Sequence, residues 1–234
     1  MDFFEKEMVE KLSAVLEYEF KCPEHLLVAV THPSYRAEQK VVIPDNQRME
    51  FLGDAVIELI VSEKLYEMFP NKNEGGMSQM RSAVTNKFPL SKMGRTLGLP
   101  EFIRLSKGEQ KADGAEREST LCDAFEAVVA AIYLDGGFSA ASTFFWSAFK
   151  KCGFDLVSEV KRFNPKGAIQ EYTQKMYKLR PEYVLEKVEG PEHDPVYSVS
   201  LKVNGETWAS GTGTNRKQAE IAAAEAALET LSIE

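Results

Sequence analysis

Two short pairs of acidic residues are the part of this sequence whose spacing could do chemistry. Glu50 and Asp54 are four residues apart, and Asp123 and Glu126 are three apart, so each pair lies on one face of a helix. The neighbours of both pairs are almost all apolar, which indicates that both helices are largely buried. Because a buried carboxylate is costly unless it is paired or binds a metal, the two pairs suggest one shared site.

A divalent cation would relieve the repulsion among four such carboxylates. Crowded carboxylates raise one another's pKa values, and hard cations that prefer oxygen ligands favour the ionised forms. Two Mg²⁺ ions about 4 Å apart could activate a water molecule and stabilise the leaving oxygen of a phosphodiester. The spacing also allows another interpretation, in which the acids lie in helix N-terminal turns or form ion pairs with Arg48, Arg81 and Arg117.

The cysteines and histidines do not indicate another kind of site. The chain has three of each, and neither set has the spacing of a zinc site, a disulfide framework or a serine-type triad. The predicted chemistry of the carboxylates needs neither residue type.

Helical periodicity dominates the first 153 residues or so and positions both acid pairs. The pattern predicts helices at about 3–20, 46–69, 76 onward with a split at Pro89, 116–134 and 139–151. The polar, proline-containing stretch that follows is predicted to be a linker.

The pattern changes after this stretch, and strands appear. We expect a helix at 165–177, three strands at 182–189, 196–203 and 207–213, and an alanine-rich helix at 215–231. Asn204-Gly205 predicts a tight hairpin, because both central residues of such a turn need a positive φ. The expected fold is therefore an all-α domain (1–155), a linker (156–164) and an α+β domain (165–234) of order α-β-β-β-α.

Composition is typical of a globular protein, but the charge is unexpected for a nucleic-acid binder. Of the 234 residues 44 % are hydrophobic, and the formal net charge is −8. No stretch approaches the eighteen or so apolar residues that span a bilayer, and the acidic N-terminus lacks the apolar run of a signal peptide. We therefore expect a cytoplasmic protein with no membrane partner.

The residues around both acid pairs resemble the ribonuclease III family. The run Glu-Phe-Leu-Gly-Asp-Ala-Val at 50–56 looks like the family's hallmark nuclease motif. The similarity continues at residues 31–35, 74–78, 107–109 and 123–137, in the family's order, and spans nearly the whole chain.

The resemblance implies that Glu50, Asp54, Asp123 and Glu126 bind the catalytic Mg²⁺, with Mn²⁺ as a possible substitute. Asp54 and Glu126 would be the residues most sensitive to change.

Two further positions are implied as auxiliary to the active site. Glu74 matches an acidic position that the family uses near the scissile strand and the subunit interface, although an exposed acid stabilised by a helix dipole would give the same pattern. Gln47 stands where the family usually has Glu, so a contact made there with metal, substrate or partner loses a charge.

Residues 165–234 resemble a double-stranded-RNA-binding domain, a module that recognises A-form shape through 2′-hydroxyls and phosphates. The residues that the resemblance assigns to the two minor grooves and the phosphates between them are Gln170, Glu171, Gln174, His193, Asn215, Arg216 and Lys217. This segment has 8 basic and 11 acidic residues. We therefore expect modest, strongly salt-sensitive binding that depends on Mg²⁺ and on dimerisation.

The implied activity is endonucleolytic cleavage of double-stranded RNA by a homodimer in which each subunit cuts one strand. The products would carry 5′-phosphates and short 3′ overhangs, and the substrates would be precursors of ribosomal and messenger RNA. A double-stranded-RNA-binding regulator that does not cut is the alternative, with Gln47 as the mark of lost activity. The complete set of four acids favours cutting, and a purely structural helical scaffold would not need them.

Overall fold

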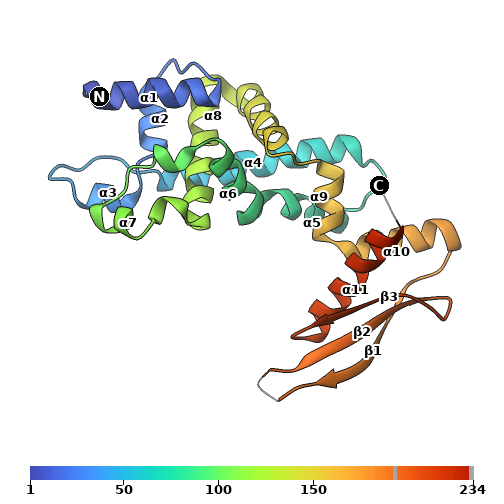
Figure 1. Cartoon of the computed structure of the whole chain (residues 1–234). Coiled ribbons are helices and arrows are strands. Elements are labelled where there is room, and N and C mark those ends of the chain that lie inside the picture. Colours follow the sequence, from blue (N-terminus) through green and yellow to red (C-terminus); the bar gives the residue numbers. More distant parts are fainter. Residues whose placement is uncertain (192–193, 232–234) are drawn as a thin grey trace. The chain divides into compact units, whose positions relative to one another are not determined.

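The computed structural model describes residues 1–191 and 194–231, except for the side chains of residues 160–163, and divides into two compact units. The units comprise Met1–Leu156 and Val157–Glu234. The first is helical, whereas the second combines helices with a three-stranded sheet (Figure 1). The predicted fold class is confirmed.

The helical unit is built from helices of very different length. They are α1 (Phe3–Leu16), α2 (Pro23–Ala29), α3 (Pro33–Ala37), α4 (Gln47–Met68), α5 (Glu74–Thr85), α6 (Lys87–Thr96), α7 (Lys107–Lys111) and α8 (Glu118–Lys151), with short 3₁₀ helices at Leu99–Glu101 and Gly114–Glu116. The stretch expected to be a linker forms a further helix, α9 (Leu156–Phe163), which begins where the two units meet in the sequence.

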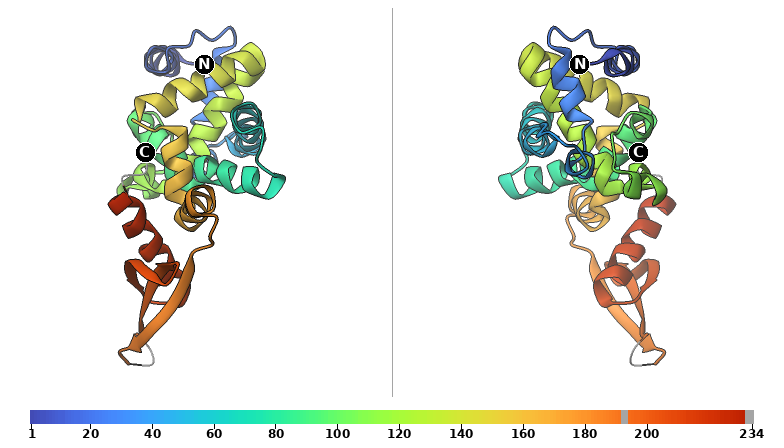
Figure 2. Two further views of the ribbon diagram at one scale, coloured as in Figure 1. Left: turned by 90° about the vertical axis from the view of Figure 1, so that its right-hand side faces the viewer. Right: turned by 90° about the vertical axis from the view of Figure 1, so that its left-hand side faces the viewer.

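Helix α8 forms the centre of the helical unit, where it packs against α2, α4 and α6 (Figures 1 and 2). Phe125, Val128, Ile132 and Phe145 are among its fully buried side chains. By length and composition alone this helix could also cross a membrane, contrary to the expectation from the sequence. Its contacts with the neighbouring helices account for that apolar composition.

Two breaks in the helical unit depend on specific residues. Gly137 has φ 77° and ψ −174°, a conformation that side chains disfavour, and it kinks α8 between the two helices expected there. The break between α5 and α6 lies at Asn86, whose side chain accepts a hydrogen bond from the backbone N–H of Phe88. The predicted split at Pro89 was therefore wrong by three residues, since this proline occupies the first turn of α6 instead.

The second unit has the predicted order of elements. In the sequence, helix α10 (Pro165–Tyr177) precedes the three strands and helix α11 (Arg216–Leu231) follows them. The strands β1 (Glu182–Glu189), β2 (Val196–Val203) and β3 (Glu206–Gly213) form one antiparallel sheet in the order β1-β2-β3. Asn204 and Gly205 have φ values of 53° and 80°, which confirms the predicted hairpin. Helix α11 packs against β2, β3 and α10.

The core of the second unit is small and depends on short side chains. Leu201 lies opposite Tyr183 and Ala209 in the sheet and packs with Ile169 of α10. Alanines 223, 224 and 227 complete this core and allow α11 to lie close to the strands.

Helices α4 and α8 approach each other most closely at a glycine. A Cβ atom added to Gly53 would lie 1.9 Å from the carbonyl oxygen of Glu126 and 2.5 Å from its carbonyl carbon. Both neighbours belong to the backbone, so they cannot move aside by a rotamer change. Only glycine therefore permits this crossing.

We predict that Gly53→Ala destabilises the protein by about 2–3 kcal/mol, because the added methyl group would force α4 away from α8. The free energy of unfolding in urea measures the effect. Gly75→Ala is the matched control, since the nearest atom to its added Cβ would be 3.9 Å away and alanine is the better helix former. Equal stability of the two variants would contradict the close contact at Gly53.

Candidate metal centre and RNA-binding residues

The crossing of α4 and α8 brings the two acid pairs together. Gly53 touches the backbone of Glu126, and Gly53 lies three residues after Glu50 and one before Asp54. The acids of α4 are close enough to repel Glu126, and both raise its pKa. The structure thus gathers all four predicted metal ligands at one helix crossing.

Three side chains of α8 could contribute ligand atoms to the same ion. One ligand atom each from Cys122, Asp123 and Glu126 lies within 4.8 Å of the others. Cys122 and Glu126 are 4 % and 8 % exposed, and the Cys122 thiol donates a hydrogen bond to Glu126 Oε1 over 3.3 Å. Cys122 was not among the predicted site residues, although its spacing of four residues from Glu126 on a buried helix indicates such a contact.

Glu126, Glu50 and Asp123 hold their protons more tightly than ordinary acids, because the pKa of each is raised. Burial raises the pKa of Glu126 to about 7. The hydrogen bond from Cys122 opposes this rise, and repulsion from Asp54, Asp123 and Glu50 adds to it. Burial likewise raises the pKa of Glu50, which Asp123 and Asp54 raise further. A bound cation would offset these costs.

Two basic groups lie close enough to act on Asp123. Burial raises the pKa of Asp123, whereas Lys87 and His32 lower it. Lys87 is the exposed first residue of α6, and no spacing in the sequence indicated its proximity to α8. The centre therefore contains positive as well as negative charge.

The donor set fits a hard divalent cation. Carboxylate oxygens are the ligands that Mg²⁺ prefers, and this ion is typically held by one or two carboxylates together with water and phosphate oxygens. Four carboxylates around one helix crossing, with the pKa values of Glu126 and Glu50 raised by burial and by mutual repulsion, meet that requirement.

The two auxiliary residues lie at different places. Gln47 is the exposed first residue of α4, one turn before Glu50. Glu74 is the exposed first residue of α5 and lines a pocket with Ser62 and Tyr66, in the C-terminal half of α4. At about 1.5 Å per residue along α4, that pocket is on the order of 20 Å from Glu50. Within one chain the structure does not bring Glu74 to the acid cluster.

The predicted RNA-binding residues that the structure describes are all exposed. They lie on α10 and at the start of α11, and comprise Gln170, Glu171, Gln174, Asn215, Arg216 and Lys217. The side chain of Asn215 accepts a hydrogen bond from the backbone N–H of Gln218 and so occupies the N-cap position of α11. His193 lies outside the described residues.

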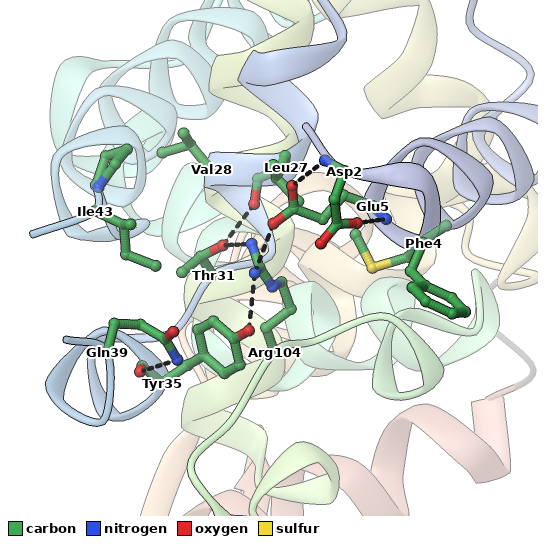
Figure 3. A pocket seen from close by; sticks show the side chains of 12 residues that line it. Asp2, Phe4, Glu5, Leu27, Val28, Thr31, Tyr35, Gln39, Ile43 and Arg104 are labelled. Carbon is green, nitrogen blue, oxygen red and sulfur yellow. Dashed lines mark hydrogen bonds and ion pairs between the residues drawn. The ribbon is translucent and has the colours of Figure 1, made fainter. Parts of the chain in front are cut away.

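A separate pocket of about 520 Å³ contains none of the predicted site residues. Figure 3 shows Arg104 at its centre, where the guanidinium donates to Glu5 Oε1 (2.8 Å), the Tyr35 hydroxyl (2.9 Å) and Thr31 Oγ1 (3.2 Å). The polar groups of this pocket satisfy one another and connect α1 to the segment around α3. We assign this network a structural role.

Comparison with known proteins gives the same picture for both units. A Ribonuclease-III-like family model matches residues 23–151, and a double-stranded RNA binding motif matches residues 165–231. The chain is 40 % identical to Ribonuclease 3 of Pseudothermotoga lettingae over 99 % of its own length and 95 % of that protein's. It is 38 % identical to Ribonuclease 3 of Borreliella burgdorferi, over 97 % and 92 % of the two chains.

A solved structure is similar to the helical unit. The nuclease domain of ribonuclease III from Campylobacter jejuni, whose flexible region is involved in dimer formation, is 40 % identical with a TM-score of 0.57. The match covers 61 % of this chain and 96 % of that domain. Sequence, family models and fold agree, and this chain belongs to the ribonuclease III family of endoribonucleases.

Proposed function

We propose that this chain is a Mg²⁺-dependent endonuclease that cuts double-stranded RNA as a homodimer and leaves 5′-phosphates and short 3′ overhangs. The observation that carries the proposal is the contact between Gly53 and the Glu126 backbone, which gathers Glu50, Asp54, Asp123 and Glu126. The resemblance to the family supports ribosomal and messenger RNA precursors as substrates and the cytoplasm as the compartment. It also supports 1–155 and 165–234 as the functional domains.

The residues around the helix crossing would have different roles in the reaction. Bound Mg²⁺, for which Mn²⁺ could substitute, supplies an activated water and stabilises the leaving oxygen. Glu126 and Asp123 of α8 and Glu50 and Asp54 of α4 would hold the ion. Lys87, which already lowers the pKa of Asp123, lies where it could offset phosphate charge.

The second unit would bind the duplex. Gln170 and Gln174 are four residues apart and both exposed, so one face of α10 offers hydrogen-bonding groups to a minor groove. Arg216 and Lys217 begin α11, where their charges add to the helix dipole to favour a phosphate. Glu171 of α10 and His193 would complete the two groove contacts.

Glu126→Gln tests the proposed reaction. We expect the wild-type chain to shorten a long RNA duplex in Mg²⁺, and the variant to lose at least about 1000-fold in cleavage rate because it loses a ligand charge at the ion. Duplex binding, measured in EDTA by fluorescence anisotropy, should change less than about twofold, since this buried residue cannot reach the RNA backbone.

Two outcomes would contradict this account of the active site. If Glu126→Gln lost binding and cleavage equally, Glu126 would be an RNA-binding residue and not a metal ligand. A wild-type chain that binds the duplex and never shortens it would favour the alternative of a regulator that does not cut. Gln47, in place of the family's usual Glu, would then be the mark of the lost activity.

The raised pKa of Glu126 predicts how the stability of the metal-free protein depends on pH. An acid whose pKa is higher in the folded state stabilises the fold while protonated, so stability falls as the pH rises from about 4.5 to about 7. We expect a loss of about 2 kcal/mol between pH 5 and pH 8 in EDTA, and less in Glu126→Gln.

Unfolding in urea at both pH values measures this loss, and Mg²⁺ at pH 8 should restore the stability of the wild type. Identical pH profiles for the wild type and Glu126→Gln would rule out this carboxylate as their cause.

A stripe of exposed apolar side chains on α4 supports the homodimer. Phe51, Leu59 and Tyr66 are 82 %, 56 % and 74 % exposed, and their spacing places them on one face of the helix. A twofold axis across this face would set Phe51 of one copy toward the pocket around Tyr66 of the other. It would also carry Glu74 toward the acid cluster of the second copy, which one chain alone does not achieve.

We predict that Phe51→Ala weakens the dimer at least tenfold, because a large exposed aromatic side chain would be the anchor of such an interface. Sedimentation equilibrium measures the dissociation constant. Phe3→Ala, which removes a ring that is 75 % exposed on α1, is the control and should leave it unchanged. A dimer that both variants leave intact would place the interface elsewhere.

A further inference from the structure

Glu220 of α11 joins the two helices that carry the predicted RNA-binding residues. Its side chain is 14 % exposed, and each of its carboxylate oxygens binds one cation. Oε2 accepts a hydrogen bond from Lys166 Nζ of α10 at 2.5 Å, and Oε1 accepts one from Arg216 Nε at 2.9 Å. Burial would raise the pKa of Glu220, but these two cations outweigh burial and keep it ionised.

Lys166 is the more enclosed of the two cations that Glu220 binds. Its Nζ lies 4.4 Å from the centre of the Tyr183 ring on β1, so an aromatic face and a carboxylate hold it from two sides. The Tyr183 hydroxyl is buried and makes no hydrogen bond within the described residues. Glu220 is therefore anchored to the body of the unit through Lys166.

Arg216 is the more exposed partner. Its side chain is 58 % exposed and stands beside Lys217 at the start of α11, where a phosphate of the duplex is expected. A carboxylate and a phosphate compete for the same guanidinium donors, because both offer anionic oxygens in a similar geometry.

We propose that Glu220 acts as an internal competitor of RNA phosphates for Arg216 and thereby sets the affinity and the salt dependence of duplex binding. The inference rests on the proposed function, because it assumes that the start of α11 faces RNA. Arg216 must leave Glu220, at least in part, before it neutralises a phosphate. The described structure shows no carboxylate partner for Lys217, so this residue can bind a phosphate without first leaving an ion pair.

Glu220→Gln in the full chain tests the proposal with a nearly isosteric change. Binding of a duplex of about 30 base pairs is followed by fluorescence anisotropy in EDTA, between 50 and 300 mM KCl. We expect three- to tenfold tighter binding at the lowest salt and a steeper slope of log K against log salt by about 1 per bound domain. Glu225→Gln removes the same charge from an exposed position of α11 and should change the affinity less than twofold.

Arg216 provides the second arm. The gain from Glu220→Gln should vanish when Arg216→Gln is also present. In the otherwise wild-type chain, Arg216→Gln should reduce the salt slope less than Lys217→Gln, a comparison that does not require the Glu220 variant to fold. Thermal unfolding of each variant separates a change in binding from a loss of structure.

The proposal is overturned if Glu220→Gln and Glu225→Gln bind alike, if folded Glu220→Gln binds more weakly than the wild type, or if Arg216→Gln lowers the slope as much as Lys217→Gln. Absence of duplex binding by every chain, wild type included, would overturn the proposed function together with this inference. If the wild type binds the duplex tightly and Glu220→Gln leaves the affinity and the salt slope unchanged, the inference alone is overturned.

Discussion

The contact between Gly53 and the backbone of Glu126 is the constraint on which the proposed site depends. It allows α4 and α8 to cross at a distance that any other residue would prevent. The same contact forces carboxylates from both helices into one partly buried space, where burial and mutual repulsion raise the pKa values of Glu126 and Glu50. Packing alone therefore leaves the helical unit with an electrostatic cost, and a divalent cation is the ligand whose charge and oxygen preference would relieve it.

Much of the fold follows from local rules that the sequence displays. The apolar period predicts α4 within one residue at each end, and Asn204-Gly205 specifies a hairpin because few other residue pairs tolerate two positive φ values. One error arose where a polar side chain determined a boundary. Asn86 ends α5 and caps α6, because its side chain accepts a hydrogen bond from the backbone N–H of Phe88. The sequence pattern had instead suggested Pro89 as the boundary.

The site could be predicted only as two separate faces. Spacing places Asp123 and Glu126 on one side of α8, but it cannot show which helix lies opposite, nor that Lys87 lies near these acids. Asp135 illustrates the same limit, since it is also an acid of α8. Its oxygens accept hydrogen bonds from the Tyr18 hydroxyl and from the backbone N–H of Cys22, so its role is structural. Tertiary contacts alone distinguish these acids.

The excess of acidic residues has to be reconciled with a polyanionic substrate. Part of the negative charge is concentrated where α4 crosses α8, and there it would serve to hold cations that phosphates also bind. Another part is paired within the second unit, where Glu220 engages both Lys166 and Arg216. The net charge of −8 is therefore a poor guide to RNA binding. The local charge at the RNA-binding surface depends on which cations there are free and which are already paired with carboxylates. Two cations, Arg216 and Lys217, begin α11, and Arg216 is already paired with Glu220. A change in the partner of this arginine is therefore a large fraction of the charge that the start of α11 can offer to a phosphate.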